Sequence, residues 1–258
     1  MASLGLHHET ATNDEIAAYC SNPNHIPLGG APYGNNVIKL SDKAVVKFGI
    51  GVTEEEAKNQ KRAYELIDHD VVRVPFVYRF FTKEQLGYII MEYMEGRVLE
   101  PVEDPSQISK ITDILAHLAK IRSSTPGALS GGVSCGILWS ESEPPFFHTI
   151  EDMEFWFNRR LSKHDPKLVF GGYELGLCHL DIAPRNFLLL QDGFLCLLDW
   201  ASAGFYPRLF EVCVLRITYG MKGSFVSDVL QLRDLTDKEE VHIKSMLQAY
   251  NNSARYYL

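Results

Sequence analysis

Short apolar runs separated by turns dominate the first third of the sequence. The runs cover residues 37–40, 44–48, 74–81 and 86–91. Their length and the turn residues between them are typical of strands, and a further short strand is expected from Ile26 into the glycine-rich loop that follows it. Between the second and third runs the apolar spacing becomes helical. This pattern predicts a five-stranded antiparallel sheet with one helix over residues 53–68.

The rest of the chain has mainly helical periodicity. Amphipathic helices are expected over residues 105–122 and 149–162, and two or three more between residues 207 and 250. Residues 123–148 are rich in Ser, Gly and Pro, which predicts a long irregular segment on the surface. The fold class is therefore α+β.

The change of pattern near Met94 divides the chain into two predicted lobes. Residues 1–94 form a nucleotide-binding sheet lobe, in which residues 1–25 are an irregular extension. That extension contains one short helix near residues 14–20, for which Asn13 is the expected cap. Residues 95–258 form a helical lobe that carries the catalytic loop and the substrate site.

One polar motif stands between apolar strands in the helical lobe. The apolar runs 187–190 and 194–198 are joined by Gln-Asp-Gly, a strong signal for a β-hairpin. His179, Asp181 and Asn186 precede the hairpin at the spacing H-x-D-x-x-x-x-N, and Asp199 follows its second strand. We expect Asn186 and Asp199 at the adjacent open ends of the hairpin, with the loop that carries Asp181 beside them.

These side chains suit phosphoryl transfer. The reaction needs a carboxylate beside the attacking hydroxyl and oxygen ligands for magnesium on the nucleotide phosphates. Asp181 can supply the first, and Asn186 and Asp199 can supply the second. Each residue alone is more often a turn former or a solvated carboxylate, and only the joint spacing favours a catalytic centre.

A lysine in an apolar strand adds a second candidate feature. Lys47 lies within the run 44–48, so it must either face solvent from an edge strand or turn inward to a partner. Glu56 is the expected partner, with Glu55 as the substitute if the helix register differs. A capping box with Thr53 would also explain Glu56 without any catalytic role. The preceding glycine-rich loop could place backbone N–H groups near a phosphate.

Composition narrows the class of protein. The chain has 258 residues, 46% of them hydrophobic, which is enough for a substantial core, and no stretch has the length of a membrane span. The N-terminus lacks a signal-peptide pattern, so the cytoplasm is the expected location.

The formal net charge of -8 argues against a nucleic-acid partner and favours a neutral or cationic substrate. The five cysteines show no disulfide or zinc spacing and are expected to be free core residues.

Taken together, these motifs resemble the aminoglycoside phosphotransferase and choline kinase-like family, relatives of the protein kinases. The resemblance covers roughly residues 28–220. It is most specific in residues 178–200, the catalytic stretch, which contains the H-x-D-x-x-x-x-N motif and Asp199. Asp199-Trp200 stands where protein kinases carry Asp-Phe-Gly, which points to the small-molecule branch. Residues 203–207 resemble the fungal members of the family. The implied fold is a bilobal protein-kinase-like fold.

The resemblance also implies a role for each residue. Asp181 would accept the proton of the substrate hydroxyl, and Asn186 and Asp199 would hold Mg²⁺. Lys47, paired to Glu56, would bind the nucleotide phosphates, and His179 would support the loop without reacting. The resemblance also implies positions for the rest of the nucleotide site. They are Gly34 and Asn35 in the glycine loop and, in the hinge expected between the two lobes, Met91, Glu92, Tyr93 and Met94.

The implied function is transfer of the γ-phosphate of ATP or GTP to a small hydroxylated acceptor, a cationic one being favoured by the charge. The main alternative is a kinase-like protein that binds nucleotide or serves as a scaffold without turnover. A protein kinase would need a peptide-binding segment after Asp199, and residues 201–206 are too short to form one. The oligomeric state is not predicted.

Two short motifs suggest other enzymes. Residues 132–136 match G-x-S-x-G, but a hydrolase needs a buried strand before this motif and a helix after it. The Gly-Ile-Gly at residues 49–51 resembles a dinucleotide-binding turn, yet Glu54 stands at its third glycine position and would repel a pyrophosphate.

Overall fold

The computed structural model describes residues 6–30, 34–102, 104–139, 143–220, 225, 228–229 and 235–256. Its N-terminal part is a five-stranded antiparallel sheet, as predicted, in the order β1-β2-β3-β5-β4. The strands are β1 (Gly29–Gly30), β2 (Asn36–Lys39), β3 (Ala44–Gly49), β4 (Val77–Lys83) and β5 (Leu86–Glu92). Because β3 lies in the middle of this order, Lys47 does not stand on an edge strand.

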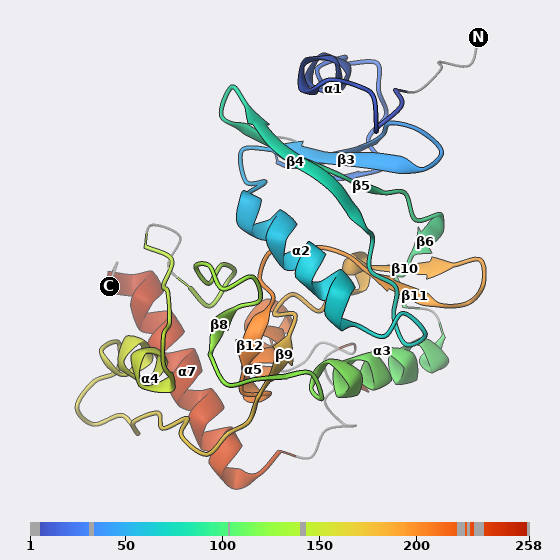
Figure 1. Ribbon diagram of the computed structural model, residues 1–258. Helices are drawn as coiled ribbons and strands as arrows, with labels where there is room; N and C mark the ends of the chain where they lie inside the picture. The colour runs from blue at the N-terminus through green and yellow to red at the C-terminus, as the bar shows by residue number, and fades with distance from the viewer. Residues whose placement is uncertain are drawn as a thin grey trace.

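Helices cover the sheet on both faces. Helix α1 (Asn13–Cys20) lies on the outer face and α2 (Glu54–Leu66) lies below it, toward the rest of the molecule (Figure 1). Alternation along β3 matches this arrangement, since Ala44 and Val46 pack in the cluster that contains α1 while Val45 packs in the cluster beside α2. Lys47 therefore shares the face of Val45 and points to the α2 side.

The N-terminal extension is only partly irregular. The predicted helix is present, but its cap is Thr12 and not Asn13, since the Thr12 hydroxyl accepts from the N–H of Glu15. Ile16 of this helix is fully buried against the sheet, and the Lys83 side chain of β4 donates to Asp14 at 2.8 Å. The helix thus belongs to the core of the sheet lobe.

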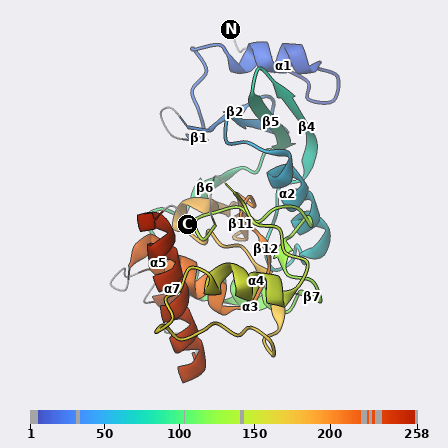
Figure 2. The same cartoon turned by 90° about the vertical axis from the view of Figure 1, so that its left-hand side faces the viewer.

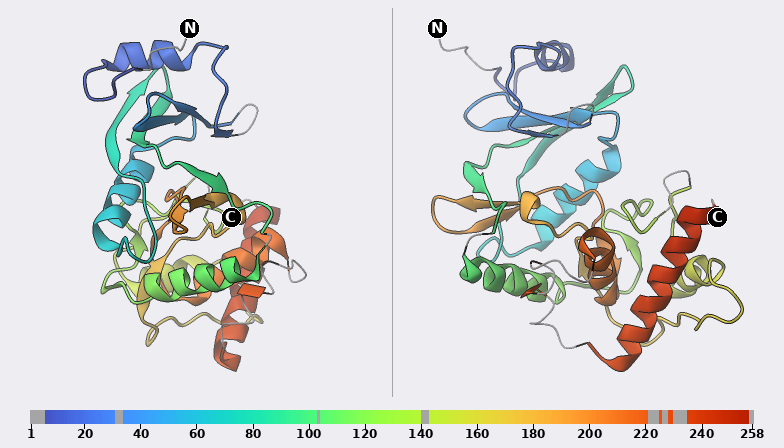
Figure 3. Two further views of the ribbon diagram at one scale, coloured as in Figure 1. Left: turned by 90° about the vertical axis from the view of Figure 1, so that its right-hand side faces the viewer. Right: turned by 180° about the vertical axis from the view of Figure 1, so that it is seen from behind.

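The C-terminal part contains the predicted helices and also short strands. The helices are α3 (Pro105–Leu118), α4 (Ile150–Asn158), α5 (Leu209–Tyr219) and α7 (Asp237–Tyr256). Helix α7 runs beside α5 and α4 at one side of the molecule (Figures 2 and 3). Two small sheets also lie in this part. The β10–β11 hairpin of one of them was predicted, whereas the other strands were not, because they have only two to four residues, too few to show a period. The strands of the two sheets are β6 (Gly96–Val98), β7 (Arg122–Ser123), β8 (Gly127–Ala128), β9 (Leu175–Cys178), β10 (Phe187–Leu190), β11 (Leu195–Leu197) and β12 (Gly204–Tyr206).

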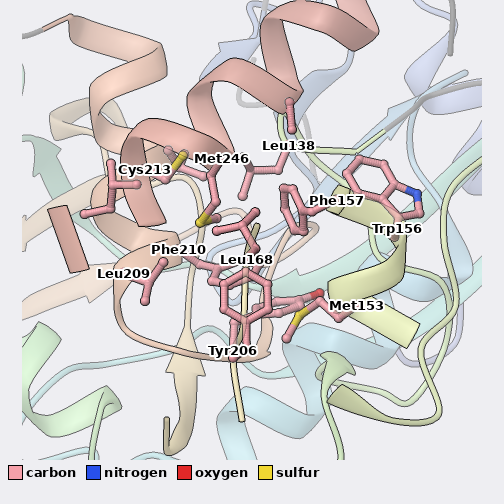
Figure 4. Close-up of a cluster of buried hydrophobic side chains, with 14 of the residues drawn as sticks. Leu138, Met153, Trp156, Phe157, Leu168, Tyr206, Leu209, Phe210, Cys213 and Met246 are labelled. Atoms are coloured by element: carbon pink, nitrogen blue, oxygen red, sulfur yellow. The ribbon is translucent and has the colours of Figure 1, made fainter. Parts of the chain in front are cut away.

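The prediction of a surface segment at residues 123–148 is wrong for much of its length. Leu138, Trp139 and Phe147 are buried, and they pack with α4, α5 and α7 in the aromatic core shown in part in Figure 4. These residues stand in apolar runs of only two or three positions among Ser, Gly and Pro, so no periodic pattern identifies them. The rings of Trp139 and Phe147 lie 5.4 Å apart and fix the segment to the lobe.

The cysteine prediction is confirmed for four of the five residues. All five cysteines are free and four of them are buried, whereas Cys135 is partly exposed. None of the described helices combines the length and the apolar composition that a membrane span needs.

Candidate active site

The predicted hairpin brings the two candidate metal ligands together. In β10 and β11, Phe187 pairs with Leu197, and the N–H of Leu198 donates to the carbonyl of Asn186 at 2.8 Å. Asn186 ends a short 3-10 turn that begins at Pro184, just before β10. Asn186 and Asp199 therefore lie at the same open end of one hairpin.

His179 ties the loop before the hairpin to the strand after it. Its Nε2 lies 3.0 Å from the carbonyl of Leu198, and its Nδ1 lies 3.3 Å from the N–H of Asp181. The ring is fully buried, and burial lowers the pKa of His179, so the imidazole is neutral. These two contacts fit a proton on Nε2. His179 therefore bridges the backbone of Asp181 and that of Leu198, the residue before Asp199.

Lys47 joins the sheet to the hairpin. Its Nζ lies 2.5 Å from the carboxylate of Glu56 and 3.2 Å from that of Asp199. Burial lowers the pKa of Lys47, but the two carboxylates outweigh burial and raise it, so the ammonium stays charged. The same ammonium, against the effect of burial, lowers the pKa of Asp199. Three charges from β3, α2 and the end of β11 thus meet at one point.

The helix start decides between the two interpretations of Glu56. The hydroxyl of Thr53 accepts from the N–H of Glu56 at 3.2 Å, which is half of a capping box. The carboxylate of Glu56, however, binds Lys47 and does not return to the backbone of Thr53. At residues 149–152 the full box forms, with Asp152 completing it. Glu56 is therefore the partner of Lys47, and the substitute Glu55 is not needed.

The carboxylate of Asp181 is held by two neighbours. Arg185 donates to its Oδ1 at 2.7 Å, and the amide of Asn186 donates to its Oδ2 at 2.8 Å. The Asn186 amide also reaches the backbone carbonyl of Asp181 at 2.9 Å. With the nitrogen turned toward Asp181, the side-chain oxygen of Asn186, which is its only atom able to bind a cation, lies on the other side of the amide.

Two residues of the site have strained backbones. Leu180 and Asp199 adopt φ values of 60° and 62°, which are unfavourable for residues with a Cβ atom. Glu211 of α5 holds the first of them, since its buried carboxylate accepts from the N–H groups of His179 at 2.7 Å and Leu180 at 3.0 Å. The sequence analysis missed Glu211. Its signal is a single acid within the apolar run of α5.

Asn59 is a second residue that the sequence analysis missed. It lies on α2 about one turn after Glu56 and is almost completely buried. Its amide donates to the carbonyls of Trp200 at 3.2 Å and Ala201 at 3.1 Å, and its Oδ1 accepts from the N–H of Ser130 at 2.9 Å. Asn59 thus fixes the segment after Asp199 to the helix that carries Glu56. A buried polar residue on a helix gives no local signal of its distant partners.

The glycine loop is closed by Asn35. The Oδ1 of Asn35 accepts from the N–H of Gly51 at 3.2 Å, so this side chain joins the loop to the turn before α2. A Cβ at Gly49 would lie 2.2 Å from the same Oδ1, which explains the glycine there. Gly34 is exposed. Ala31, Pro32 and Tyr33, which belong to this loop in the sequence, lie outside the described residues.

Of the four predicted hinge residues, Met91 and Glu92 end β5, and Tyr93 and Met94 lie in the link to β6. Met91 is buried beside α2, where its sulfur accepts from the side chain of Gln60. The N–H of Glu92 donates to Phe76 at 2.8 Å, and the N–H of Tyr93 donates to Lys43 at 2.9 Å. These bonds fix the path of the chain up to Met94.

The donor set fits a magnesium ion that is bound together with nucleotide. In the described part of the chain no cluster of three or more His, Cys, Asp or Glu side chains could hold a metal by itself. Magnesium in kinases takes only one or two protein ligands and completes its shell with phosphates and water. One carboxylate from Asp199 and one amide oxygen from Asn186 meet that requirement.

The hydrolase alternative does not fit the structure. Ser134 is almost completely buried, and its hydroxyl accepts from that of Tyr206 at 2.8 Å. The residues around it form neither a strand before the serine nor a helix after it. The motif at residues 132–136 therefore lacks the geometry of a nucleophile elbow.

Comparisons with known proteins address the family and the fold of the chain. The sequence profile described as the phosphotransferase enzyme family matches residues 30–233. A thermostable mutant of the aminoglycoside phosphotransferase APH(4)-Ia superposes with a TM-score of 0.57 at 14% identity, over 92% of this chain and 88% of that one. No curated protein sequence matches the chain.

Two other solved structures are similar to the same extent. A putative fructosamine-3-kinase from Haemophilus somnus 129PT has a TM-score of 0.56 at 13% identity, over 91% of this chain and 85% of that one. The GDP and kanamycin complex of APH(2")-IIIa has a TM-score of 0.55 at 16% identity, over 90% and 84%. At these identities the matches show the fold, and they confirm the predicted protein-kinase-like architecture.

Proposed function

Since the chain belongs to the phosphotransferase enzyme family, we propose that it transfers the γ-phosphoryl group of a nucleoside triphosphate to a hydroxyl of a small molecule. The observation that carries this proposal is the position of Lys47 between Glu56 and Asp199. It places a cation from the sheet beside a carboxylate of the catalytic stretch. An ammonium and a carboxylate placed in this way suit a nucleoside triphosphate that binds beside them with a divalent cation.

The nucleotide has a proposed place for each of its parts. The base would contact the backbone of the hinge at residues 91–94, and the phosphates would lie near Lys47 and the glycine loop. Asn186 and Asp199 would hold Mg²⁺, which would neutralise phosphate charge. Related structures are described as complexes with AMP-PNP, ADP or GDP, and they support ATP or GTP as the donor.

Asp181 is the proposed base. The acceptor oxygen would form a bond to the γ-phosphorus while the bond from that phosphorus to the β–γ bridging oxygen breaks. The hydroxyl proton would pass to the carboxylate of Asp181, whose position is set by His179 and Asn186. Catalysis would consist mainly of positioning and charge neutralisation.

The proposed acceptor is a small, hydroxylated and preferably cationic molecule. Related structures are described as complexes with hygromycin B and kanamycin, and the net charge of -8 suits a cationic ligand. We place the boundary between the nucleotide-binding lobe and the acceptor-binding lobe at residue 94. A place in the fungal branch of the family and a cytoplasmic location remain predictions from sequence.

The test is transfer of labelled γ-phosphate from MgATP and MgGTP to a panel of aminoglycosides, sugars and glycated amines. Wild-type protein should label at least one acceptor class, and Asp181→Asn should not. Arg122→Gln, at a surface ion pair with Glu174, is a matched control that should behave as wild type. Binding of MgATP without any labelled product or phosphate release would contradict the proposed enzyme.

The same experiment addresses the alternative, a kinase-like protein that binds nucleotide without turnover. One observation favours that alternative: both carboxylate oxygens of Asp181 are already engaged by Arg185 and Asn186. Nucleotide binding with no transfer and no hydrolysis would support the scaffold. Release of phosphate that depends on Asp181 would support the enzyme.

A further inference from the structure

The inference concerns Arg185, whose side chain shares Asp181 with Asn186. The two contacts on the carboxylate differ in how firmly they are held. Asn186 is buried and also bonds the backbone of Asp181 at 2.9 Å, so it is fixed by the loop itself. The Arg185 side chain is 47% exposed and reaches the carboxylate by a single bond at 2.7 Å. Of the two donors, Arg185 is therefore the one that can leave.

The acceptor hydroxyl needs a lone pair on the carboxylate of Asp181. Oδ2 lies against the buried Asn186, whereas Oδ1 is the oxygen that the half-exposed Arg185 reaches. Oδ1 can accept a second hydrogen bond, but the guanidinium stabilises the carboxylate and makes it a weaker base, so an acceptor that displaces Arg185 restores the basicity that proton transfer needs. The displaced guanidinium would remain attached to the loop, four residues from Asp181 and adjacent to Asn186.

The guanidinium would then be next to the group that carries the developing charge. Arg forms forked, charge-assisted hydrogen bonds to phosphate, and arginines stabilise the transferred phosphoryl group in other phosphotransfer enzymes. Tyr219 at the end of α5 offers a second polar contact. Despite the effect of burial, Asp181 and Tyr219 raise the pKa of Arg185, so it keeps its charge.

We propose that Arg185 is a catalytic residue that pairs with Asp181 in the free protein and moves to the transferred phosphoryl group when the acceptor hydroxyl takes its place. This inference rests on the proposed function. It assigns to Arg185 a contact that is made in the transition state and not with the nucleoside diphosphate.

The test uses MgADP with aluminium fluoride, a planar mimic of the transferred phosphoryl group, so no acceptor has to be known. In wild-type protein aluminium fluoride should tighten MgADP binding. Arg185→Gln should reduce that tightening by about tenfold or more, while the affinity for MgADP alone stays within about twofold. Arg122→Gln removes an arginine of similar exposure, 45%, from a surface ion pair and should leave both affinities unchanged.

A double-mutant cycle separates a direct role from one through Asp181. If Arg185 contacts the phosphoryl group, Arg185→Gln should still weaken the aluminium fluoride complex in the Asp181→Asn background. If Arg185→Gln has no effect in that background, Arg185 acts only by orienting Asp181, and the inference is overturned. Equal loss of MgADP affinity with and without aluminium fluoride would overturn it as well.

The two proposals fail in different ways. Wild-type protein that neither binds MgADP nor responds to aluminium fluoride would overturn the proposed phosphotransferase and, with it, the role of Arg185. A wild-type response that is unchanged in Arg185→Gln would overturn only the role of Arg185.

Discussion

The ammonium of Lys47 lies 3.2 Å from the carboxylate of Asp199, so the central strand of the sheet directly meets the end of the β10–β11 hairpin. Lys47 also pairs with Glu56, which gives the group of three side chains one positive and two negative charges. The excess negative charge suits a divalent cation that arrives with nucleotide phosphates.

Removal of Lys47 should lower both the stability of the fold and the affinity for nucleotide, and a second substitution should restore only the stability. Lys47→Met leaves the carboxylate of Glu56, which is 2% exposed, without its cation, and we expect a loss of about 3 kcal/mol in the free energy of unfolding. The double variant Lys47→Met/Glu56→Leu should recover most of that stability, because it removes both buried charges. Urea unfolding measures this effect. Recovery of MgATP affinity in the double variant would contradict a phosphate-binding role for Lys47.

Asp199→Asn should change how nucleotide binding responds to magnesium. Wild-type protein should bind ADP more tightly with Mg²⁺ than with a chelator, and the variant should lose most of this difference because the carboxylate proposed to hold the metal is gone. Calorimetric titration with and without Mg²⁺ measures it. An Asp199→Asn protein with the full Mg²⁺ effect would exclude this residue as a ligand.

Asp181→Asn should separate chemistry from binding. The amide keeps the size of the side chain and loses the base, so we expect phosphate transfer or hydrolysis to fall by about 10²- to 10⁴-fold. The affinity for MgADP should stay within about twofold, since Asp181 is proposed to act on the acceptor side. Near-normal turnover in this variant would exclude Asp181 as the base.

Asn59→Ala should weaken both the fold and the nucleotide site. It leaves the buried carbonyl of Trp200 and the partly buried carbonyl of Ala201 without their donor, at an expected cost of about 2 kcal/mol in unfolding free energy. Because this segment follows Asp199 directly, the affinity for MgADP should fall as well.

Asn158→Ala is the matched control for Asn59→Ala. Asn158 makes two hydrogen bonds of 2.8 Å to the backbone of Leu168, in the cluster around α4. Asn158→Ala should lower the unfolding free energy by about the same amount as Asn59→Ala, and it should leave the affinity for MgADP unchanged. If both variants lose affinity equally, Asn59 has only a general structural role.

Acid should destabilise the protein through His242. Burial lowers the pKa of this histidine below its ordinary value of 6.5, and its Nδ1 lies 3.1 Å from the hydroxyl of Tyr173. As pH falls below 6.5 the unfolded chain takes up a proton that the folded ring resists, so the free energy of unfolding falls. Urea midpoints at about pH 7.5 and 5.5 should differ less in His242→Gln than in wild type. The difference should not vanish, because burial also lowers the pKa values of His8 and His179.

The sequence by itself determined the local elements of this protein. Capping at Thr149 and Asp152, the Asp-Gly turn of the hairpin and the alternation in β3 each depend on residues within a few positions of one another. The H-x-D-x-x-x-x-N spacing likewise lies within one loop. For this reason the five-stranded sheet, most of the helices and the meeting of Asn186 with Asp199 could be predicted.

Only the tertiary structure decided which distant residues support the site. Asn59 and Trp200 are 141 positions apart, and no local pattern relates them. The burial of Trp139 in a Ser- and Gly-rich segment, and the hold of Glu211 on the strained Leu180, also depend on packing between elements. A buried polar group must find its partner wherever the fold brings one, and so its role is visible only when the chain is folded.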